Sequence, residues 1–266
     1  MPSSDDAFYL PLGEGRWSST VHTTGPWDAR FQHGGPPAAL LGRAVEQCEP
    51  RDDAFVARMT VEILGPVPVG ELAVRSRVLR PGRSVELVEA VLSADGRDAA
   101  RAAAWRVRRT DQEGVAPRHA VPPPLPAATP AELPSGGWVD GYLSAVEWRF
   151  VEGRFDVQGP ATVWSRLLHP LVPDEEPSPL QRVLAVADSG NGLSSELDLT
   201  QWHFINPELT VHLHREAVGE WVCVDAQTAI SQGGAGLATT RLSDQQGPIG
   251  VGAQTLLVAP RSAAVS

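Results

Sequence analysis

The sequence contains no lysine, because all 22 of its basic residues are arginines. This absence excludes mechanisms that depend on a lysine amine, such as Schiff-base formation or phosphate binding by a P-loop lysine. Cysteine is also scarce, since Cys48 and Cys223 lie far apart and neither has a cysteine or histidine neighbour at metal-ligand spacing. This distribution argues against a disulfide framework and a zinc site. We expect neither a metal nor an organic cofactor.

Long apolar runs are absent as well. No stretch approaches the roughly 18 uncharged residues that a membrane span needs. The segment MPSSDDAFYL at the start is acidic rather than basic, unlike a targeting segment. We therefore expect a cytoplasmic protein. The net charge of −10 at pH 7 and the pI near 5.2 disfavour nucleic acid and anionic membrane surfaces as partners.

The chain of 266 residues is long enough for one large core or for two domains of about 130 residues each. Pro36 and Pro37 suit the first turn of a helix, and apolar residues continue at helical spacing as far as Cys48. Residues 54–109 then form four runs of alternating apolar and polar residues, separated by glycine and proline turns. One helix followed by four antiparallel strands suggests a sheet wrapped round that helix.

The second half of the chain repeats this pattern. MTVEIL at 59–64 corresponds to LTVHLH at 209–214, with an offset of 150 residues. Between the copies, residues 111–137 are rich in proline, alanine and glycine, which indicates an extended, exposed linker. We therefore divide the chain into 1–110, the linker 111–137, and 138–266. Two such copies would form a pseudo-dimer whose facing surfaces are the natural ligand site.

The second predicted helix ends in an aspartate. Apolar residues from Leu180 to Ala187 share one helix face, and we expect Gly190, Asn191 and Gly192 to end the helix. Asp188 thus lies in a last turn, where a negative charge is disfavoured. One interpretation is a solvated side chain on the polar edge of the helix, and the other is a functional carboxylate.

Several motifs in order resemble the double-hotdog acyl-CoA thioesterases, which are related to the bacterial type II acyl-CoA thioesterase. They are HGG before the first helix, LRPGRS from Leu79, and NPELTVHLHR in the second copy. The resemblance extends over roughly Trp17 to Leu257. It implies an α+β tandem (double) hotdog with two antiparallel sheets, each wrapped round a central helix. It also implies hydrolysis of a fatty acyl-CoA thioester.

The resemblance further implies three catalytic residues. In that family a water is held between an aspartate, a threonine or similar polar residue, and a glutamine, which match Asp188, Asn206 and Gln254 here. Asparagine in place of threonine is a departure from the family pattern, because the asparagine side chain has an amide and no hydroxyl group. The alternatives are that Asn206 only caps a turn and that Gln254 is a buried structural amide.

We assign five further residues to substrate binding. His33 belongs to the HGG motif, and Gly34 and Gly35 would present backbone N–H groups at a helix N-terminus to the developing oxyanion. Arg80 and Arg83 of LRPGRS are candidates to meet the phosphates of coenzyme A. The alternatives are a tight turn for the glycines and a solvated loop for the arginines.

Two other functions compete with the thioesterase. A duplicate without catalytic activity would bind acyl-CoA or acyl chains, and would keep an apolar tunnel while scattering the three polar residues. A hotdog enoyl-CoA hydratase would place Asp28 and His33, which have the D-x4-H spacing, in one cavity, but the intervening ARFQ lacks Asn-Pro. In either case, further copies of the chain could pair through exposed sheet edges.

Overall fold

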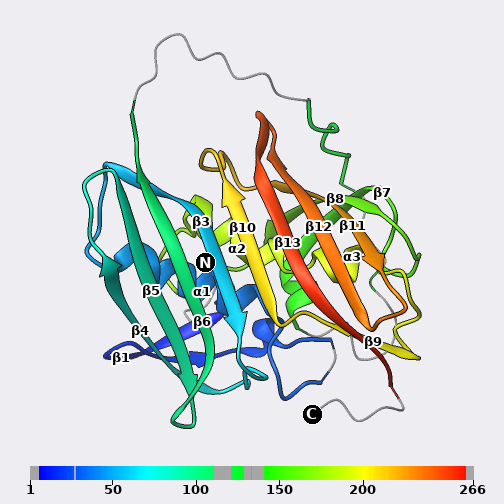
Figure 1. Ribbon diagram of the computed structural model, residues 1–266, viewed down its shortest axis with the longest axis horizontal. Helices are drawn as coiled ribbons and strands as arrows, with labels where there is room; N and C mark the ends of the chain where they lie inside the picture. Colours follow the sequence, from blue (N-terminus) through cyan, green and yellow to red (C-terminus); the bar gives the residue numbers. More distant parts are fainter. Residues whose placement is uncertain (1–5, 27, 111–120, 129–132, 134–140, 262–266) are drawn as a thin grey trace.

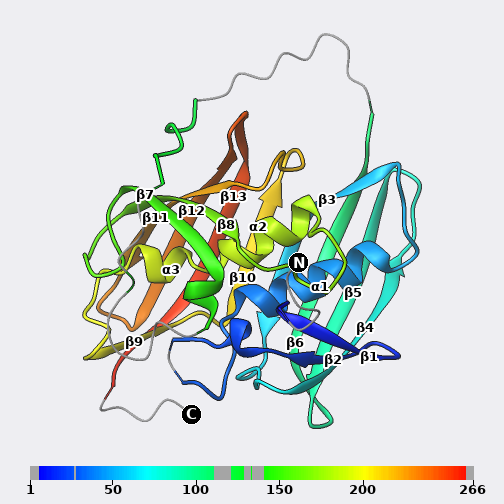
Figure 2. The same ribbon diagram turned by 180° about the vertical axis from the view of Figure 1, so that it is seen from behind.

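The computed structural model describes residues 6–26, 28–110, 121–128, 133 and 141–261. Two helices lie side by side on one face of a broad antiparallel sheet (Figures 1 and 2). Among the described residues, no helix is both long and apolar enough to cross a membrane. Both cysteines are free thiols, and Cys223 is buried.

The elements of the first half are β1 (Tyr9–Gly13), β2 (Arg16–Ser19), the 3₁₀ helix η1 (Val21–Thr23), α1 (Gly35–Gln47), β3 (Ala54–Ile63), β4 (Glu71–Arg80), β5 (Val85–Ala94) and β6 (Arg97–Arg108). Those of the second half are η2 (Tyr142–Ala145), β7 (Val146–Glu152), β8 (Ala161–Leu167), α2 (Pro179–Ala187), α3 (Gly190–Leu193), β9 (Trp202–Ile205), β10 (Glu208–Leu213), β11 (Val222–Ile230), β12 (Ala235–Asp244) and β13 (Gly247–Pro260).

In the described part of the chain, 13 strands form one continuous sheet in the order β1-β2-β4-β5-β6-β3-β10-β13-β12-β11-β8-β7, with β9 paired to β13. The order of the second half, read outward from β10, mirrors that of the first half, read outward from β3. The predicted α+β architecture is confirmed, and its two sheets join edge to edge through β3 and β10. The outer edges are β1 and β7, where pairing between copies of the chain stays a prediction.

The two strands that join the halves are the repeated segments themselves. β3 and β10 run antiparallel, and Thr60 lies opposite Thr210, with their hydroxyl oxygens 3.0 Å apart. Since these residues are 150 positions apart, the offset of the repeat, the pseudo-two-fold axis passes between them. The repeat predicted from the sequence therefore positions the junction of the two halves.

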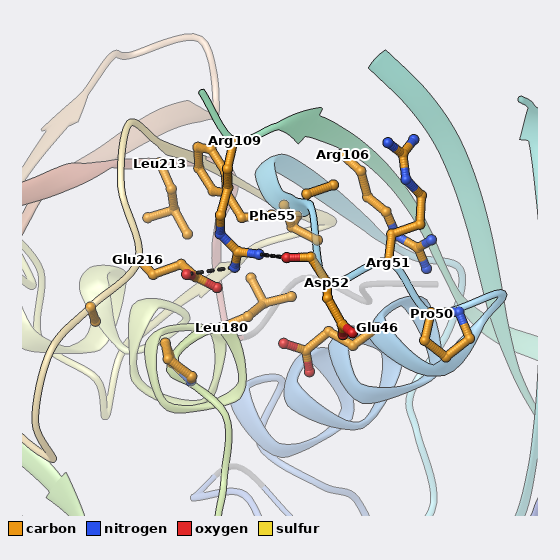
Figure 3. Close-up of a pocket in the computed structure, with 14 residues that line it drawn as sticks. Glu46, Pro50, Arg51, Asp52, Phe55, Arg106, Arg109, Leu180, Leu213 and Glu216 are labelled. Atoms are coloured by element: carbon orange, nitrogen blue, oxygen red, sulfur yellow. Dashed lines mark hydrogen bonds and ion pairs between the residues drawn. The ribbon is translucent and has the colours of Figure 1, made fainter. Parts of the chain in front are cut away.

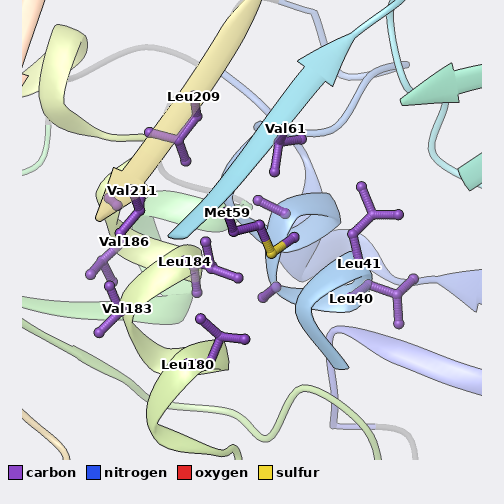
Figure 4. Packing of buried hydrophobic residues seen from close by; sticks show 14 of the residues in the cluster. Leu40, Leu41, Met59, Val61, Leu180, Val183, Leu184, Val186, Leu209 and Val211 are labelled. Atoms are coloured by element: carbon purple, nitrogen blue, oxygen red, sulfur yellow. The ribbon is translucent and has the colours of Figure 1, made fainter. Parts of the chain in front are cut away.

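The core lies between this junction and the two helices (Figure 4). Leu40 and Leu41 of α1 and Leu184 of α2 are fully buried, as is Met59 of β3. Burial of each such side chain contributes about 1.5–3 kcal/mol to folding. Gly42 lets the helices approach closely, because a Cβ there would lie 2.5 Å from Cδ1 of Leu184.

The glycines after Asp188 do not end the helical run, which corrects the sequence prediction. α2 ends at Ala187, but Asp188 and Ser189 keep right-handed helical backbone angles, and α3 follows at once. The small residue at Gly190 allows this turn to press against β12, because a Cβ there would lie 2.7 Å from Cγ2 of Thr240. Gly190 therefore serves close packing rather than termination of the helix.

The predicted linker falls largely outside the described residues, which include 121–128 and 133. These residues form no helix or strand, as expected of a linker. However, the carbonyls of Pro123 and Pro126 accept hydrogen bonds from Trp164 and Arg149. The described part is therefore tied to the second half rather than fully exposed.

Candidate active site

A cavity of about 430 Å³ lies between the two halves of the chain. Its walls are mostly apolar, and three of its apolar residues, Leu64, Ile205 and Leu257, are themselves at least 40% exposed. The other lining residues are Phe31, Gln32, His33, Gly34, Pro37, Val61, Ile63, Gly65, Pro66, Val67, Ala100, Asp188, Asn191, Asn206 and Pro207. Both halves thus contribute, as the duplication predicts for a ligand site.

The Asp188 carboxylate lies in this cavity wall and is nearly buried, at 4% exposure. It caps the C-terminus of α2, an unfavourable place for negative charge. The antiparallel neighbour α1 compensates, because its N-cap residue Gly34 lies directly against the carboxylate. A helix N-terminus carries partial positive charge and stabilises an anion. Asp188 is therefore held on the favourable end of the other helix.

Two side-chain amides fix one oxygen of this carboxylate. Asn206, between β9 and β10, donates from Nδ2 to Oδ1 of Asp188 over 2.8 Å. Gln254, on β13, donates from Nε2 to the same oxygen over 3.2 Å and to the Asp188 carbonyl over 3.0 Å. The structure thus brings together all three residues proposed as catalytic, and their catalytic role stays a prediction.

Gln254 uses both ends of its amide for protein contacts. Its Oε1 accepts the backbone N–H of Asn191 over 3.1 Å, so Gln254 joins α3 to the end of α2. The residue is 1% exposed and does not line the cavity. Its amide thus holds the Asp188 carboxylate, and the orientation of a water by Gln254, which the resemblance implies, stays a prediction.

His33 approaches the other carboxylate oxygen, with Nδ1 at 3.5 Å from Oδ2 of Asp188. The same Nδ1 accepts the N–H of Gly35 over 3.0 Å, which places the ring proton of the neutral imidazole on Nε2. Burial lowers the pKa of His33, and the nearby Asp188 charge only partly opposes this shift. His33 is therefore neutral at pH 7.

The His33 ring stacks on Tyr142, with centroids 3.9 Å apart and planes 10° apart. The Tyr142 hydroxyl donates to the carbonyl of Ala185 and also bonds to Ser189, each over 2.8 Å. Burial raises the pKa of Tyr142 far above its usual range, so the phenol stays protonated. Tyr142 thus fixes both His33 and the end of α2. Sequence reasoning did not identify it, because no local pattern marks a tyrosine that contacts residues so far along the chain.

The two glycines of the HGG motif permit the helix contact. A Cβ on Gly34 would lie 2.5 Å from Oδ2 of Asp188, and a Cβ on Gly35 would lie 2.1 Å from the Ala185 carbonyl oxygen. Within the described part of the chain, no acceptor bonds to the Gly34 N–H, whereas Gly35 donates to His33. Of the two predicted oxyanion donors, only Gly34 lines the cavity with its N–H free. The expectation for Gly35 is therefore corrected.

Residues 23–107 match the acyl-CoA thioesterase N-terminal domain, and residues 117–258 match the acyl-CoA thioesterase C-terminal domain. The chain belongs to the acyl-CoA thioesterase family. A comparison with curated protein sequences gives no significant match.

Solved structures show the same fold over the whole chain. An acyl-CoA thioesterase II, TesB2, from Mycobacterium marinum is 17% identical with a TM-score of 0.67, and each chain covers 100% of the other. A protein of unknown function with a hot dog fold from Alicyclobacillus acidocaldarius is 18% identical with a TM-score of 0.69, also with 100% coverage of both chains. The tesB protein from Mycobacterium avium subspecies paratuberculosis is 15% identical with a TM-score of 0.65, covering 95% of this chain and 96% of its own. The predicted tandem hotdog and the family resemblance are confirmed.

The arginines of LRPGRS do not line the cavity that contains Asp188. Arg80 ends β4 and donates to the Val85 carbonyl across the hairpin, and the carbonyl of Arg83 accepts from Arg51. This hairpin is level with the start of β3, whereas the cavity adjoins its end. The structure therefore gives no contact that supports phosphate binding by Arg80 and Arg83 beside Asp188. Arginine content alone could not show at which end of the strands they lie.

The hydratase alternative also lacks the geometry it requires. His33 lines the cavity, but Asp28 does not, and its carboxylate is paired with Arg30 at 2.6 Å. Hydrogen bonds from Arg30 lower the pKa of Asp28 to about 2. Asp28 and His33 do not face one cavity.

A second cavity, of about 210 Å³, lies at the opposite ends of the two helices (Figure 3). The carboxylate of Glu46 points into it and accepts hydrogen bonds from Ser178, the N-cap of α2, and from Gln181. Glu46 is therefore the spatial counterpart of Asp188, since it lies in the last turn of α1 and contacts the N-cap of α2, whereas Asp188 caps α2 and lies against the N-cap of α1. Here the walls combine apolar side chains with several charged ones, which include Arg51, Asp52, Arg106, Arg109 and Glu216.

Proposed function

We propose that this protein hydrolyses a fatty acyl-CoA to the free acid and coenzyme A, with Asp188 as the general base. The single observation that carries the proposal is the Asp188 carboxylate, fixed through Oδ1 by two amides, at the wall of an apolar cavity between the halves. Membership of the thioesterase family supports the reaction class.

The apolar cavity supports a fatty acyl group as the bound part of the substrate. Its volume of about 430 Å³ is in the usual range for small-molecule sites, about 300–1,000 Å³. The exposed apolar residues Leu64, Ile205 and Leu257 lie at its wall, where an aliphatic chain would cover them. The coenzyme A part would extend outside.

The free carboxylate oxygen determines where the water binds in this proposal. Because Oδ1 of Asp188 already accepts two amide N–H groups, Oδ2 accepts the water proton, on the side of Gly34 and His33. The water oxygen attacks the thioester carbon while Asp188 takes the proton. When the C–S bond breaks, the departing thiolate receives that proton, and the carboxylate is restored.

The thioester carbonyl oxygen gains negative charge during this attack and requires hydrogen-bond donors. The Gly34 N–H at the N-terminus of α1 is a donor beside the Asp188 carboxylate, and His33, whose Nε2 carries the ring proton, lines the same cavity. The position of Gly34 beside Oδ2 supports a carbonyl bound with its oxygen toward α1 and its carbon toward the water.

One experiment tests the proposal against binding without turnover. Release of free thiol is measured from acyl-CoA esters of increasing chain length, with the wild type, Asp188→Asn and Glu46→Gln. Glu46→Gln is the matched control, because it neutralises the counterpart carboxylate in the other cavity. We expect turnover to fall at least about a hundredfold in Asp188→Asn and to stay within about twofold in Glu46→Gln.

The outcomes separate the alternatives. Saturable acyl-CoA binding without thiol release by the wild type would assign the protein to the binding class. Equal turnover by the wild type and Asp188→Asn would remove Asp188 from the mechanism while leaving a thioesterase.

A further inference from the structure

Three potential metal ligands converge outside the cavity described above. They are Asp6, just before β1, His22 in η1, and His169, after β8. Their ligand atoms all lie within 4.8 Å of one another. None of the three lines the cavity that contains Asp188, so they form a separate cluster.

The geometry of the cluster is close to that of a coordination site. Oδ1 of Asp6 lies 3.1 Å from Nε2 of His22 and 2.9 Å from Nδ1 of His169. In a tetrahedral zinc site with bonds of 2.0–2.1 Å, neighbouring ligand atoms are about 3.3 Å apart. A small outward movement of the three side chains would therefore admit the ion.

The rings are held in this arrangement by their surroundings. The two imidazoles stack with centroids 3.9 Å apart and planes 18° apart, so their nitrogens face the same carboxylate oxygen. Phe8 packs edge-on against both, at 6.1 Å and 6.5 Å. Ring orientation is therefore set before any ion binds.

Short hydrogen bonds also connect the three chain segments. Phe8 N–H donates to the Pro170 carbonyl over 3.1 Å, which joins the segment of Asp6 to that of His169. Thr20 N–H donates to the Phe8 carbonyl over 3.0 Å, and the Thr20 hydroxyl donates to the Ala7 carbonyl over 2.7 Å, which joins η1 to the same segment. The ligands are thus preorganised although they come from both halves of the chain.

We propose that Asp6, His22 and His169 bind one divalent transition-metal ion, Zn²⁺ in the first place. Two imidazoles and one carboxylate form a set of nitrogen and oxygen ligands that suits this ion. The side chains are 38%, 20% and 20% exposed, which leaves a fourth position to water. The bound ion links the start of the first half to the loop after β8 and thereby stabilises the contact between the halves.

The test is calorimetric titration of ZnCl₂ into chelator-treated full-length protein. We expect one ion per chain for the wild type, affinity at least about tenfold weaker in Asp6→Asn and His169→Ala, and no change in His212→Ala, an exposed histidine on β10. Zn²⁺ should also raise the melting temperature of the wild type, and a chelator should reverse the rise.

A spectroscopic measurement on the wild type tests the proposal even if a variant fails to fold. Co²⁺ added to the wild type should give the visible absorption of a four-coordinate nitrogen and oxygen site. The proposal is overturned if the wild type binds no Zn²⁺ at millimolar concentration. It is equally overturned if folded His169→Ala binds Zn²⁺ as tightly as the wild type, or if Co²⁺ gives only the spectrum of the hydrated ion.

Discussion

The C-termini of α1 and α2 occupy related positions about the pseudo-two-fold axis, yet they are completed in different ways. At α1, the guanidinium of Arg106 donates to the carbonyls of Val45, Cys48 and Glu49 and pairs with Glu86 at 2.9 Å. At α2, Gln254 donates to the Asp188 carbonyl, and the carboxylate faces an apolar cavity. At the end of α1 an arginine satisfies the free carbonyls, whereas the end of α2 borders the apolar cavity.

The difference between the two helix ends shows which residues distinguish the candidate active site from its counterpart in the duplicated fold. Both ends place a carboxylate on the N-terminus of the neighbouring helix, so this placement belongs to the architecture. With the offset of 150, Ala104 corresponds to Gln254, and Val56 to Asn206. The first copy thus lacks both amides that fix Asp188. The amides and the apolar walls, rather than the carboxylate alone, distinguish the candidate site.

Removing the Arg106 guanidinium should cause the largest loss of stability. In Arg106→Met the buried Glu86 loses the nearer of its two arginine partners and keeps only Arg51, 4.0 Å away, while three carbonyls lose a donor. We therefore expect the free energy of unfolding to fall by about 3 kcal/mol. Urea denaturation at pH 7 measures this. Adding Glu86→Gln should recover part of the loss. A fall in the free energy of unfolding below about 1 kcal/mol in Arg106→Met would show that the guanidinium does not stabilise the C-terminus of α1.

Adding a side-chain atom at the contact between α1 and α2 should cause the second-largest loss of stability. In Gly35→Ala the new Cβ meets the Ala185 carbonyl, and separating α1 from α2 should cost about 3 kcal/mol, the upper end for overpacking. Thiol release should fall too, because Asp188 moves away from Gly34. Gly192→Ala is the control, since a Cβ there meets nothing within 4 Å. Equal stability of the two variants would contradict the close approach.

Exchanging the buried amide should have a smaller effect on stability but a specific one on turnover. Gln254→Leu leaves the Asn191 N–H and the Asp188 carbonyl without this partner, which should cost about 1–2 kcal/mol. We expect kcat to fall at least about tenfold with KM nearly unchanged, because the carboxylate loses its orientation. Gln181→Leu removes the amide that contacts Glu46, and it should leave kcat unaltered.

The smallest effect concerns the pH dependence of stability. Burial raises the pKa of Glu46 above 4.5, partly opposed by the hydrogen bonds from Gln181 and Ser178. The folded state therefore binds more protons than the unfolded state, and the wild type loses stability as pH rises from 4.5 through the raised pKa. Glu46→Gln removes this loss, so its melting temperature relative to the wild type should be higher at pH 7 than at pH 4. A constant difference would show that Glu46 does not titrate in this range.

Local pattern predicted much of the fold. The proline-led first turns of α1 and α2 and the alternation in β3 to β6 follow from residues close in sequence. The repeat that meets at Thr60 and Thr210 follows from comparison of two segments 150 residues apart. Such periodicity reflects which face of an element is buried, and burial is decided locally. The helical turn after Asp188 was missed because glycines also serve close packing.

The candidate site was predicted only in part. The family resemblance predicted the three residues that meet at Asp188, but not that Gln254 donates to both its carboxylate and its backbone carbonyl. Other features depend on contacts between segments distant in sequence. They are the position of Tyr142, the hydrogen bonds of Arg106 at the end of α1, and the cluster of Asp6 with two histidines. No spacing rule reports these contacts. The opposite location of Arg80 and Arg83 has the same cause, because a strand sequence does not reveal which of its ends adjoins the ligand.

The pairing of β3 with β10 has a consequence for how this protein behaves on dilution. In an assembly of separate subunits, an interface of this kind would dissociate at low concentration. Here both strands belong to one chain, so their effective concentration is independent of how much protein is present. The cavity between the halves should therefore persist in a single molecule. The two copies are also encoded separately in the chain. A substitution at the C-terminus of α1 therefore leaves the C-terminus of α2 unchanged, so the two related ends are free to differ.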